Sequence, residues 1–308
     1  MDKVYLQELI DQIKQDRSTN VLSVFFVKKP SPLKMYSYLP QISTGIQNEI
    51  IDLVLPYIEN QLKDSILVDY NPVGVADGEI EYIAADQIEQ ICTFFNSITN
   101  DVLITEMDLL EIPKISFYCL KISYGEKDIY LFRQFSKMKK LRSGLIARFL
   151  NNELTKIDSE FLGIDEAVDM IYIDRNVIIF NHIALERIFN YRDRYLSKTN
   201  EAMGEILSQD VIVNLEQFQN DCCRDVRIMK RFTNLMTQKR LPLFFENYDK
   251  VPEIVKDLDL RIEFDDGGKM IYHDKSQLYH IVALMSDSYF ESLLAKRKGI
   301  AKLEEPLS

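Results

Sequence analysis

The first two thirds of the chain alternate between stretches with a two-residue hydrophobic period and stretches with a helical period. Short runs rich in β-branched and aromatic residues predict strands, namely VLSVFFV, SILVDY, EIEYIAA, ISFYCLKIS and DIYLFRQFS. A helical period covers residues 44–62, and a shorter one covers residues 87–96. The YGEK sequence predicts a β-hairpin, and AVDMIYI and VIIFNHI predict a second hairpin that turns at residues 174–176.

The pattern changes near residue 195 and becomes mainly helical. Helical periodicity continues to Lys239, and we expect Pro242 to end it. The segment LRIEFDDGGKMIYHD predicts a late strand pair, and residues 276–298 predict a closing helix. The sequence therefore predicts an α+β fold, with a mixed α/β domain over residues 1–195 that contains a mixed sheet with hairpins, and a mainly helical domain over residues 196–308.

The composition is that of a packed globular protein. Of 308 residues, 46% are hydrophobic, and 17 Phe and 16 Tyr supply large side chains for a core. No uncharged apolar run approaches the roughly 18 residues of a membrane span, and the N-terminal segment lacks the pattern of a signal peptide. The four cysteines include no Cys-x-x-Cys pair and are expected to be buried thiols. We therefore expect a soluble protein in the reducing cytoplasm.

Charge is distributed unevenly along the chain, whose formal net charge is −11. Three windows contain no acidic residue and together hold 15 of the 37 basic residues; they are residues 129–152, 226–245 and 292–303. The other 252 residues carry 22 basic and all 48 acidic side chains, a balance of −26. A protein polarised in this way can bind nucleic acid although its total charge is negative.

The basic side chains are arranged as candidate phosphate contacts. In the first window they surround a predicted strand-to-helix junction, where backbone N–H groups of a helix start would add to a phosphate site. At the second, Arg227 and Arg231, together with Arg224 just before the window, follow a three-four spacing that places them on one face of a predicted helix. The candidate DNA-binding residues are Arg133, Lys137, Lys139, Lys140, Arg142, Arg148, Arg224, Arg227, Lys230, Arg231, Lys296, Arg297 and Lys298.

Each window also has a simpler interpretation, because a basic run is more often a solvated surface that balances nearby acids. Three such windows favour DNA binding over that interpretation only if they meet in space.

The layout of the segment EFLGIDEAVDMIYIDRNVIIFNH is similar to that of a metal-dependent nuclease site. Such a site needs a carboxylate and a lysine on the second strand, to complete the metal ligands and position the attacking water. The corresponding residues of this chain are Phe180, Asn181 and His182, which include neither a carboxylate nor a lysine. Asp165, Glu166 and Asp169 are therefore interpreted as a solvated hairpin edge, and His182 as a packed or hydrogen-bonded residue.

Other familiar catalytic patterns are missing from the sequence. It contains no phosphate-binding Gly-x-x-x-x-Gly-Lys-Ser/Thr loop, no Gly-x-Gly-x-x-Gly turn, no Gly-x-Ser-x-Gly elbow and no His-Glu-x-x-His helix. We predict no catalytic residue, no metal site and no cofactor, which favours a protein that is not an enzyme.

The central block, FRQFSKMKKLRSGLIARFLNNELTKIDSEFLGIDEAVDMIYIDRNVIIFNHIALERIFNY, resembles the KwaB-like family, the cytosolic component of the bacterial Kiwa anti-phage defence system. The closing segment DKSQLYHIVALMSDSYFESLLAKRKGIAK resembles the end of the same family. The resemblance implies a DNA-binding effector that pairs with KwaA, a membrane protein that senses phage at the inner membrane. It also implies that bound phage DNA is blocked from replication and late transcription.

The resemblance further implies self-association, and a homodimer or tetramer with a shared basic groove would reconcile DNA binding with the negative total charge. Recruitment to the inner membrane would then come from the KwaA-like partner. Two alternatives stay open at this point. One is a metal-dependent nuclease whose site is not recognisable from its sequence, and the other is a non-enzymatic scaffold whose basic windows meet KwaA or anionic lipid.

Overall fold

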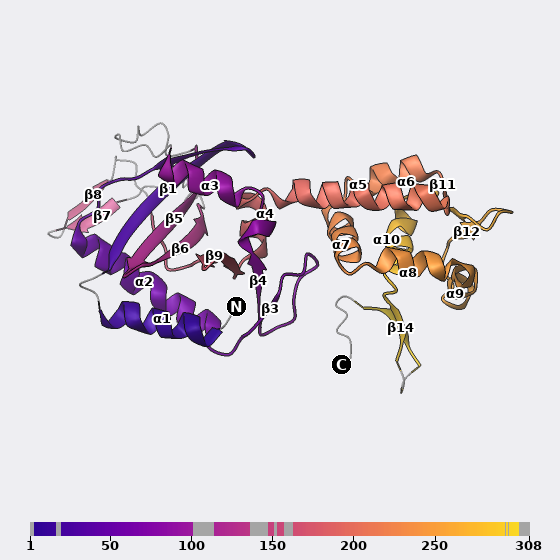
Figure 1. Cartoon of the computed structure of the whole chain (residues 1–308), viewed down its shortest axis with the longest axis horizontal. Helices are drawn as coiled ribbons and strands as arrows, with labels where there is room; N and C mark the ends of the chain where they lie inside the picture. Colours follow the sequence, from indigo (N-terminus) through magenta and orange to yellow (C-terminus); the bar gives the residue numbers. More distant parts are fainter. Residues whose placement is uncertain are drawn as a thin grey trace. The chain divides into compact units, whose positions relative to one another are not determined.

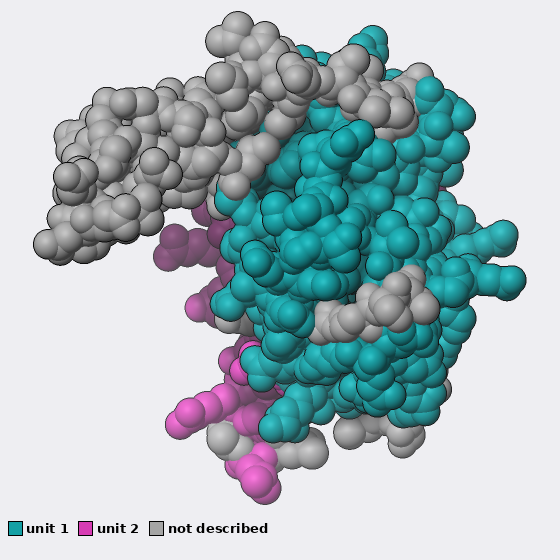
Figure 2. All heavy atoms as spheres, turned by 90° about the vertical axis from the view of Figure 1, so that its left-hand side faces the viewer, with its two compact units in different colours: residues 1–69, 78–190 teal, residues 70–77, 191–308 magenta. Residues whose placement is uncertain are grey.

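A computed structural model describes residues 3–16, 20–100, 114–135, 147–150, 153–156, 163–292, 294 and 296–301 (Figure 1). The chain forms two compact units, which Figure 2 distinguishes by colour. Unit 1 contains Met1–Asp69 and Gly78–Asn190, and unit 2 contains Tyr70–Asp77 and Tyr191–Ser308. The domain boundary expected between residues 195 and 196 stays a prediction.

Unit 1 is built on an eight-stranded mixed sheet with the strand order β2-β1-β5-β6-β9-β10-β4-β3. Its strands are β1 (Val21–Ser31), β2 (Lys34–Tyr38), β3 (Ile66–Asp69), β4 (Glu79–Ala84), β5 (Ile115–Tyr124), β6 (Lys127–Gln134), β9 (Met170–Ile173) and β10 (Asn176–Ile179). Strands β3 and β4 are parallel, whereas the other neighbours are antiparallel. With the helices described below, this sheet confirms the predicted α+β class.

Both predicted hairpins are confirmed. Strands β5 and β6 are joined by a two-residue turn at Gly125 and Glu126, where Gly125 has a φ of 59°. Strands β9 and β10 are joined at Asp174 and Arg175, whose φ values are 47° and 62°. Two consecutive positive φ values match the twist of the flanking strands, which is the reason that such turns are favoured in hairpins.

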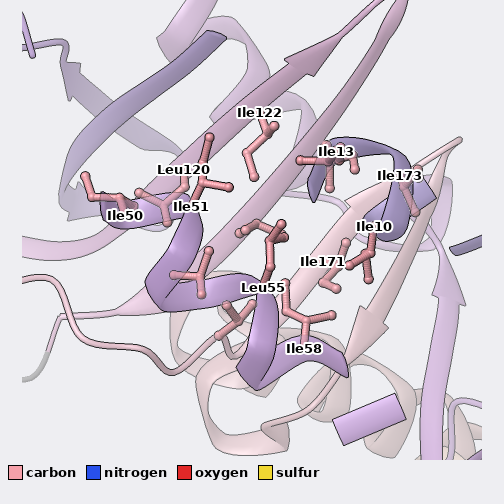
Figure 3. Close-up of a cluster of buried hydrophobic side chains, with 14 of the residues drawn as sticks. Ile10, Ile13, Ile50, Ile51, Leu55, Ile58, Leu120, Ile122, Ile171 and Ile173 are labelled. Atoms are coloured by element: carbon pink, nitrogen blue, oxygen red, sulfur yellow. The ribbon is translucent and has the colours of Figure 1, made fainter. Parts of the chain in front are cut away.

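Helices cover both faces of the sheet. On one face lie α1 (Lys3–Gln15) and α2 (Thr44–Leu62), whose isoleucine and leucine side chains pack against β5 and β9 (Figure 3). On the other face, Phe94 of α3 (Ile91–Thr99) contacts Phe117 and Phe132 edge-on or tilted. Strand β5 is therefore buried on both faces, which explains its nearly continuous apolar sequence.

Unit 2 is mainly helical, as predicted. Its helices are α5 (Tyr191–Gln209), α6 (Leu215–Cys222), α7 (Val226–Thr237), α8 (Arg240–Glu246), α9 (Val251–Asp257) and α10 (Lys275–Met285). A small sheet combines β11 (Ile212–Val213), β12 (Glu263–Phe264) and β13 (Met270–Ile271), and the last two form the predicted late strand pair. Buried side chains such as Phe218, Phe232 and Tyr272 pack between these elements.

The predicted closing helix over residues 276–298 is wrong in its second half. Helix α10 ends at Met285, and β14 (Tyr289–Glu291) and β15 (Lys298–Ile300) follow as an antiparallel pair. Asp287 has a φ of 52°, and the N–H groups of Asp287 and Ser288 donate to the carbonyls of Leu284 and Ala283. This is a Schellman end, which usually carries glycine at the left-handed position. Aspartate there conceals the end of the helix in the sequence.

The prediction for Pro242 is also wrong. Helix α7 already ends at Thr237, and Lys239 adopts a φ of 54°. Pro242 lies in the first turn of α8, where its missing N–H has no intrahelical acceptor in any case.

The cysteine prediction holds only in part. All four thiols are free, and Cys119 and Cys222 are buried, which raises their pKa. Cys92, however, is exposed, and Cys223 is half-buried. Among the helices that the structure describes, none is long and apolar enough to cross a bilayer.

Candidate nucleic-acid interface

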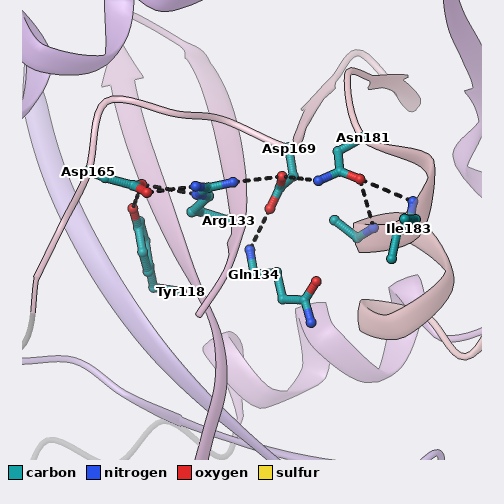
Figure 4. Close-up of polar contacts among 8 residues, drawn as sticks. Tyr118, Arg133, Gln134, Asp165, Asp169, Asn181 and Ile183 are labelled. Carbon is teal, nitrogen blue, oxygen red and sulfur yellow. Dashed lines mark hydrogen bonds and ion pairs between the residues drawn. The ribbon is translucent and has the colours of Figure 1, made fainter. Parts of the chain in front are cut away.

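The first basic window begins inside unit 1, at the end of β6, and its first basic residue is committed to carboxylates. Arg133 donates to Asp165 through Nε at 2.9 Å and Nη2 at 2.6 Å, which forms a two-pronged ion pair (Figure 4). Its Nη1 donates to Asp169 Oδ1 at 2.9 Å. One guanidinium therefore joins two carboxylates that lie 32 and 36 residues further along the chain.

Asp169 is the buried centre of this network, with only 1% of its surface exposed. Besides Arg133, its carboxylate accepts hydrogen bonds from the Asn181 side chain at 2.8 Å and from the Gln134 backbone at 2.6 Å. Asn181 also caps α4 (His182–Ile188), because its side-chain oxygen accepts from the N–H groups of the first turn. The network thus joins the end of β6, the start of β9 and the start of α4.

These contacts correct the interpretation of Asp169 as part of a solvated hairpin edge. The carboxylate is buried and saturated by donors from the protein itself. Local sequence contains no sign of this contact, because Arg133 is distant along the chain and only the β6–β9 pairing brings it close to Asp169. Across the described ranges, no group of three or more His, Cys, Asp or Glu side chains is placed to hold a metal ion.

The protonation of the network follows from its geometry. Partial burial would raise the pKa of Asp165, but the hydrogen bonds and charge of Arg133 and the hydroxyl of Tyr118 together hold that pKa below its usual range. The same contact with Asp165 is the largest cause that raises the pKa of Arg133. Burial, followed by the Asp165 charge, raises the pKa of Tyr118. The ion pair is therefore fully charged at neutral pH.

His182 is paired, in agreement with the sequence interpretation. Its Nε2 lies 2.9 Å from a carboxylate oxygen of Glu81, which is buried on β4.

The other basic residues of the first window follow Arg133 in the chain. Lys137, Lys139, Lys140 and Arg142 lie outside the described residues. Arg148 belongs to β7 (Ala147–Leu150), which pairs with β8 (Glu153–Lys156), but its side chain is not described. Their assignment to DNA stays a prediction.

The second window, residues 226–245, lies in unit 2 on α7 and α8, and Arg224 precedes it. Asp225 caps this helix by accepting from the N–H of Arg227, so Arg224 falls in the preceding turn and outside the helix. The predicted helical row of three arginines is therefore reduced to Arg227 and Arg231. The side chain of Arg227 is 89% exposed, whereas Arg231 donates to the Tyr279 hydroxyl at 2.7 Å and lies over that ring.

Lys230 lies on the same helix, with its Nζ 5.7 Å from the ring centroid of Tyr195. The opposite face of α7 is the core face, as its buried residues show; they are Ile228, Met229, Phe232, Thr233 and Leu235.

The third window lies on the β14–β15 hairpin, also in unit 2. Lys296, Arg297 and Lys298 are all exposed. The Lys296 Nζ lies 3.7 Å from Glu291, and the Lys298 Nζ donates to the carbonyl of Asp257. This window therefore presents its positive charges on a β-hairpin rather than on a helix end.

Fold and charge together define an α+β protein with candidate phosphate contacts on several separate elements. The family described as "Kiwa protein KwaB-like" matches residues 112–295, which is more than half of the chain. The chain belongs to the KwaB-like family and is thus a component of Kiwa anti-phage defence. Neither a curated protein nor a solved structure matches it. The matched range contains the Arg133 network, α7 and β14.

The buried carboxylate of Asp169 gives a first test. We expect Asp169→Asn to lower the free energy of unfolding of unit 1 by about 3–5 kcal/mol, because a buried charge pair loses one partner. The matched Asp165→Asn removes a carboxylate that is 51% exposed and should cost about 1 kcal/mol or less. Chemical denaturation followed by circular dichroism measures both. Equal losses in the two variants would contradict a buried centre at Asp169.

The lowered pKa of Asp165 predicts a specific pH dependence. Its pKa is lower in the folded than in the unfolded state, so its stabilising contribution is complete above the unfolded value of about 4 and is lost as the pH falls through the folded value. The difference in melting temperature between wild type and Asp165→Asn should be constant from about pH 5 to 7 and shrink below about pH 4. A difference that persists unchanged at about pH 3 would refute this assignment.

Proposed function

We propose that this KwaB-like protein is the DNA-binding effector of its Kiwa system. It binds phage DNA largely without sequence specificity and thereby blocks replication and transcription. The observation that carries the proposal is the segregation of charge, since three acid-free windows hold 15 of the 37 basic residues in a chain of net charge −11. Family membership supplies the biological setting, which is defence against phage.

The exposed basic side chains of unit 2 support binding through phosphates. Three exposed arginines can reach a backbone without first losing buried contacts; they are Arg224 in the turn before α7, Arg227 on α7 and Arg297 in the β14–β15 hairpin. Arg227 also pairs with Asp225 at 3.3 Å, but its side chain is 89% exposed. Contacts to phosphate fix the position of a protein on DNA but carry little sequence information. Arg133 differs, because a phosphate would have to compete there with Asp165 and Asp169. In our proposal its main part is to fix the end of β6 from which Lys137, Lys139 and Lys140 follow.

The negative total charge requires an arrangement that keeps the acidic surface away from DNA. A monomer with this net charge would repel DNA at long range, whereas a homodimer or tetramer can line one groove with the basic windows of several copies. We propose such self-association. In keeping with its family, the protein would act in the cytoplasm and be recruited to the inner membrane by a KwaA-like partner.

Binding driven by phosphates predicts strong salt dependence. If about four phosphates are neutralised, affinity for duplex DNA should fall about a hundredfold between about 50 mM and about 200 mM salt, because bound counterions are released. Fluorescence anisotropy on duplexes of unrelated sequence measures this dependence. Each duplex is then recovered after incubation with magnesium. An affinity that is insensitive to salt contradicts the proposal, and metal-dependent cleavage favours the nuclease alternative instead.

The first window should contribute most of the phosphate contacts. Changing Lys137, Lys139 and Lys140 together to Glu should abolish DNA binding, because each reversal replaces an attraction near the backbone by a repulsion. The matched reversal of Lys296, Arg297 and Lys298 changes the charge equally and should weaken binding less. Filter binding at one salt concentration, after a thermal melt of each variant, compares them. A central variant that binds like the wild type would refute the role of the first window.

A further inference from the structure

Unit 2 contains a small polar pocket that the proposed DNA contacts do not explain. It is lined by five separate segments, namely the loop of residues 70–77, α7, the start of α8, the link after α10 and the end of β15. Its lining residues are Asn71, Val73, Arg231, Asn234, Leu235, Gln238, Arg240, Ser286, Ser288 and Ala301. Among these described lining residues, two are arginines and none is acidic, in a chain with 48 acidic residues.

Both guanidinium groups donate a hydrogen bond to a neutral group. Arg231 donates to the Tyr279 hydroxyl at 2.7 Å, with its guanidinium carbon 4.4 Å from the ring centroid. Arg240 donates through Nη1 to the carbonyl of Ser286 at 2.8 Å. Among the described residues, Arg231 makes no ion pair with a carboxylate. Its positive charge is therefore not neutralised by an acid of the described chain, although its position is fixed.

Further hydrogen-bonding groups surround the two arginines. Arg231, Asn234 and Gln238 are three and four residues apart, so one face of α7 presents a guanidinium and two amides to the pocket. On the link after α10, the Ser286 and Ser288 hydroxyls lie 2.7 Å apart, and the Ser286 hydroxyl donates to the carbonyl of Val282. The acidic residue between them, Asp287, lines a different, mainly apolar pocket.

We propose that this pocket binds a terminal phosphate monoester of a nucleotide, either free or at the 5′ end of a DNA strand. The two guanidinium groups can form charge-assisted hydrogen bonds to a phosphate, and the Asn234 and Gln238 amides and the Ser288 hydroxyl can donate to its remaining oxygens. A concave site lined from several sides suits a terminal phosphate, because a phosphate inside a strand has two of its oxygens esterified and presents fewer to a recess. This proposal rests on the proposed function where the phosphate is carried by DNA.

The test compares a short single-stranded oligonucleotide bearing a 5′ phosphate with the same oligonucleotide bearing a 5′ hydroxyl. The wild type should bind the phosphorylated form about tenfold more tightly, because charge-assisted hydrogen bonds form only to that group. Asn234→Asp keeps the side-chain shape but adds a negative charge to the pocket, and should remove the preference. Gln238→Glu, at an exposed position where folding is not at risk, should do the same.

The matched control is Arg227→Gln, which removes a charge one helical turn before Arg231 but outside the pocket. It should lower the affinity for both oligonucleotides and leave their ratio unchanged. A parallel melt with adenosine 5′-monophosphate and with adenosine tests the pocket without DNA. The monophosphate alone should raise the melting temperature of the wild type and of Arg227→Gln, and leave that of Asn234→Asp unchanged.

The outcomes separate the two proposals. Equal binding of both oligonucleotides by the wild type overturns the terminal-phosphate site and leaves DNA binding in place. If neither oligonucleotide binds but the monophosphate still stabilises the wild type, the pocket is supported and the DNA-binding proposal fails. If neither oligonucleotide binds and the monophosphate has no effect, both proposals are overturned.

Discussion

The buried carboxylate of Asp169 constrains three segments of unit 1, which are the end of β6, the start of β9 and the start of α4. A charge with 1% exposure is stable only if it is neutralised and fully hydrogen-bonded, and Arg133, Asn181 and the Gln134 backbone together meet that requirement. Arg133 and Gln134 belong to β6, and Asn181 follows β10 and caps α4. Their positions are therefore coupled, and the chain leaves β6 and enters β9 at points that one ion pair holds together.

This network fixes the end of β6, from which the rest of the first basic window continues. Arg133 is the member of the window that the structure describes at side-chain level, and its positive charge is used internally. The lysines that we propose to bind DNA follow Arg133 in the chain. Arg133 can therefore have a structural role while these lysines bind phosphates. The same division occurs in unit 2, where Arg231 stacks on Tyr279 while Arg227 is exposed. Basic residues that are neighbours in the sequence can therefore differ in role, because the groups that each one contacts determine whether its charge is used inside the protein or exposed.

Much of the fold follows from local sequence. The helix predicted over residues 44–62 and the two hairpins of the large sheet are found as predicted, because hydrophobic period and turn residues agree there. The predictions failed where a contact between distant residues was decisive, or where an unusual residue stands at a helix boundary. Aspartate in the left-handed position ended α10 early, and Asp225 began α7 after Arg224. Arg240, within an acid-free window, was not among the predicted contacts, although it lines the arginine pocket.

By itself, the sequence determined the α+β class, the uneven distribution of charge and the resemblance to the KwaB-like family. The first two depend on composition and on short-range periodicity, and the resemblance depends on the residues of two segments; all of these can be read along the chain. Only the tertiary structure decided which charges are paired. Strand pairing brought Asp169 to Arg133 across 36 residues, and helix packing brought Arg231 and Arg240 to one pocket with Ser286. Electrostatic energy depends on distance in space and on burial, and neither is a function of position in the sequence.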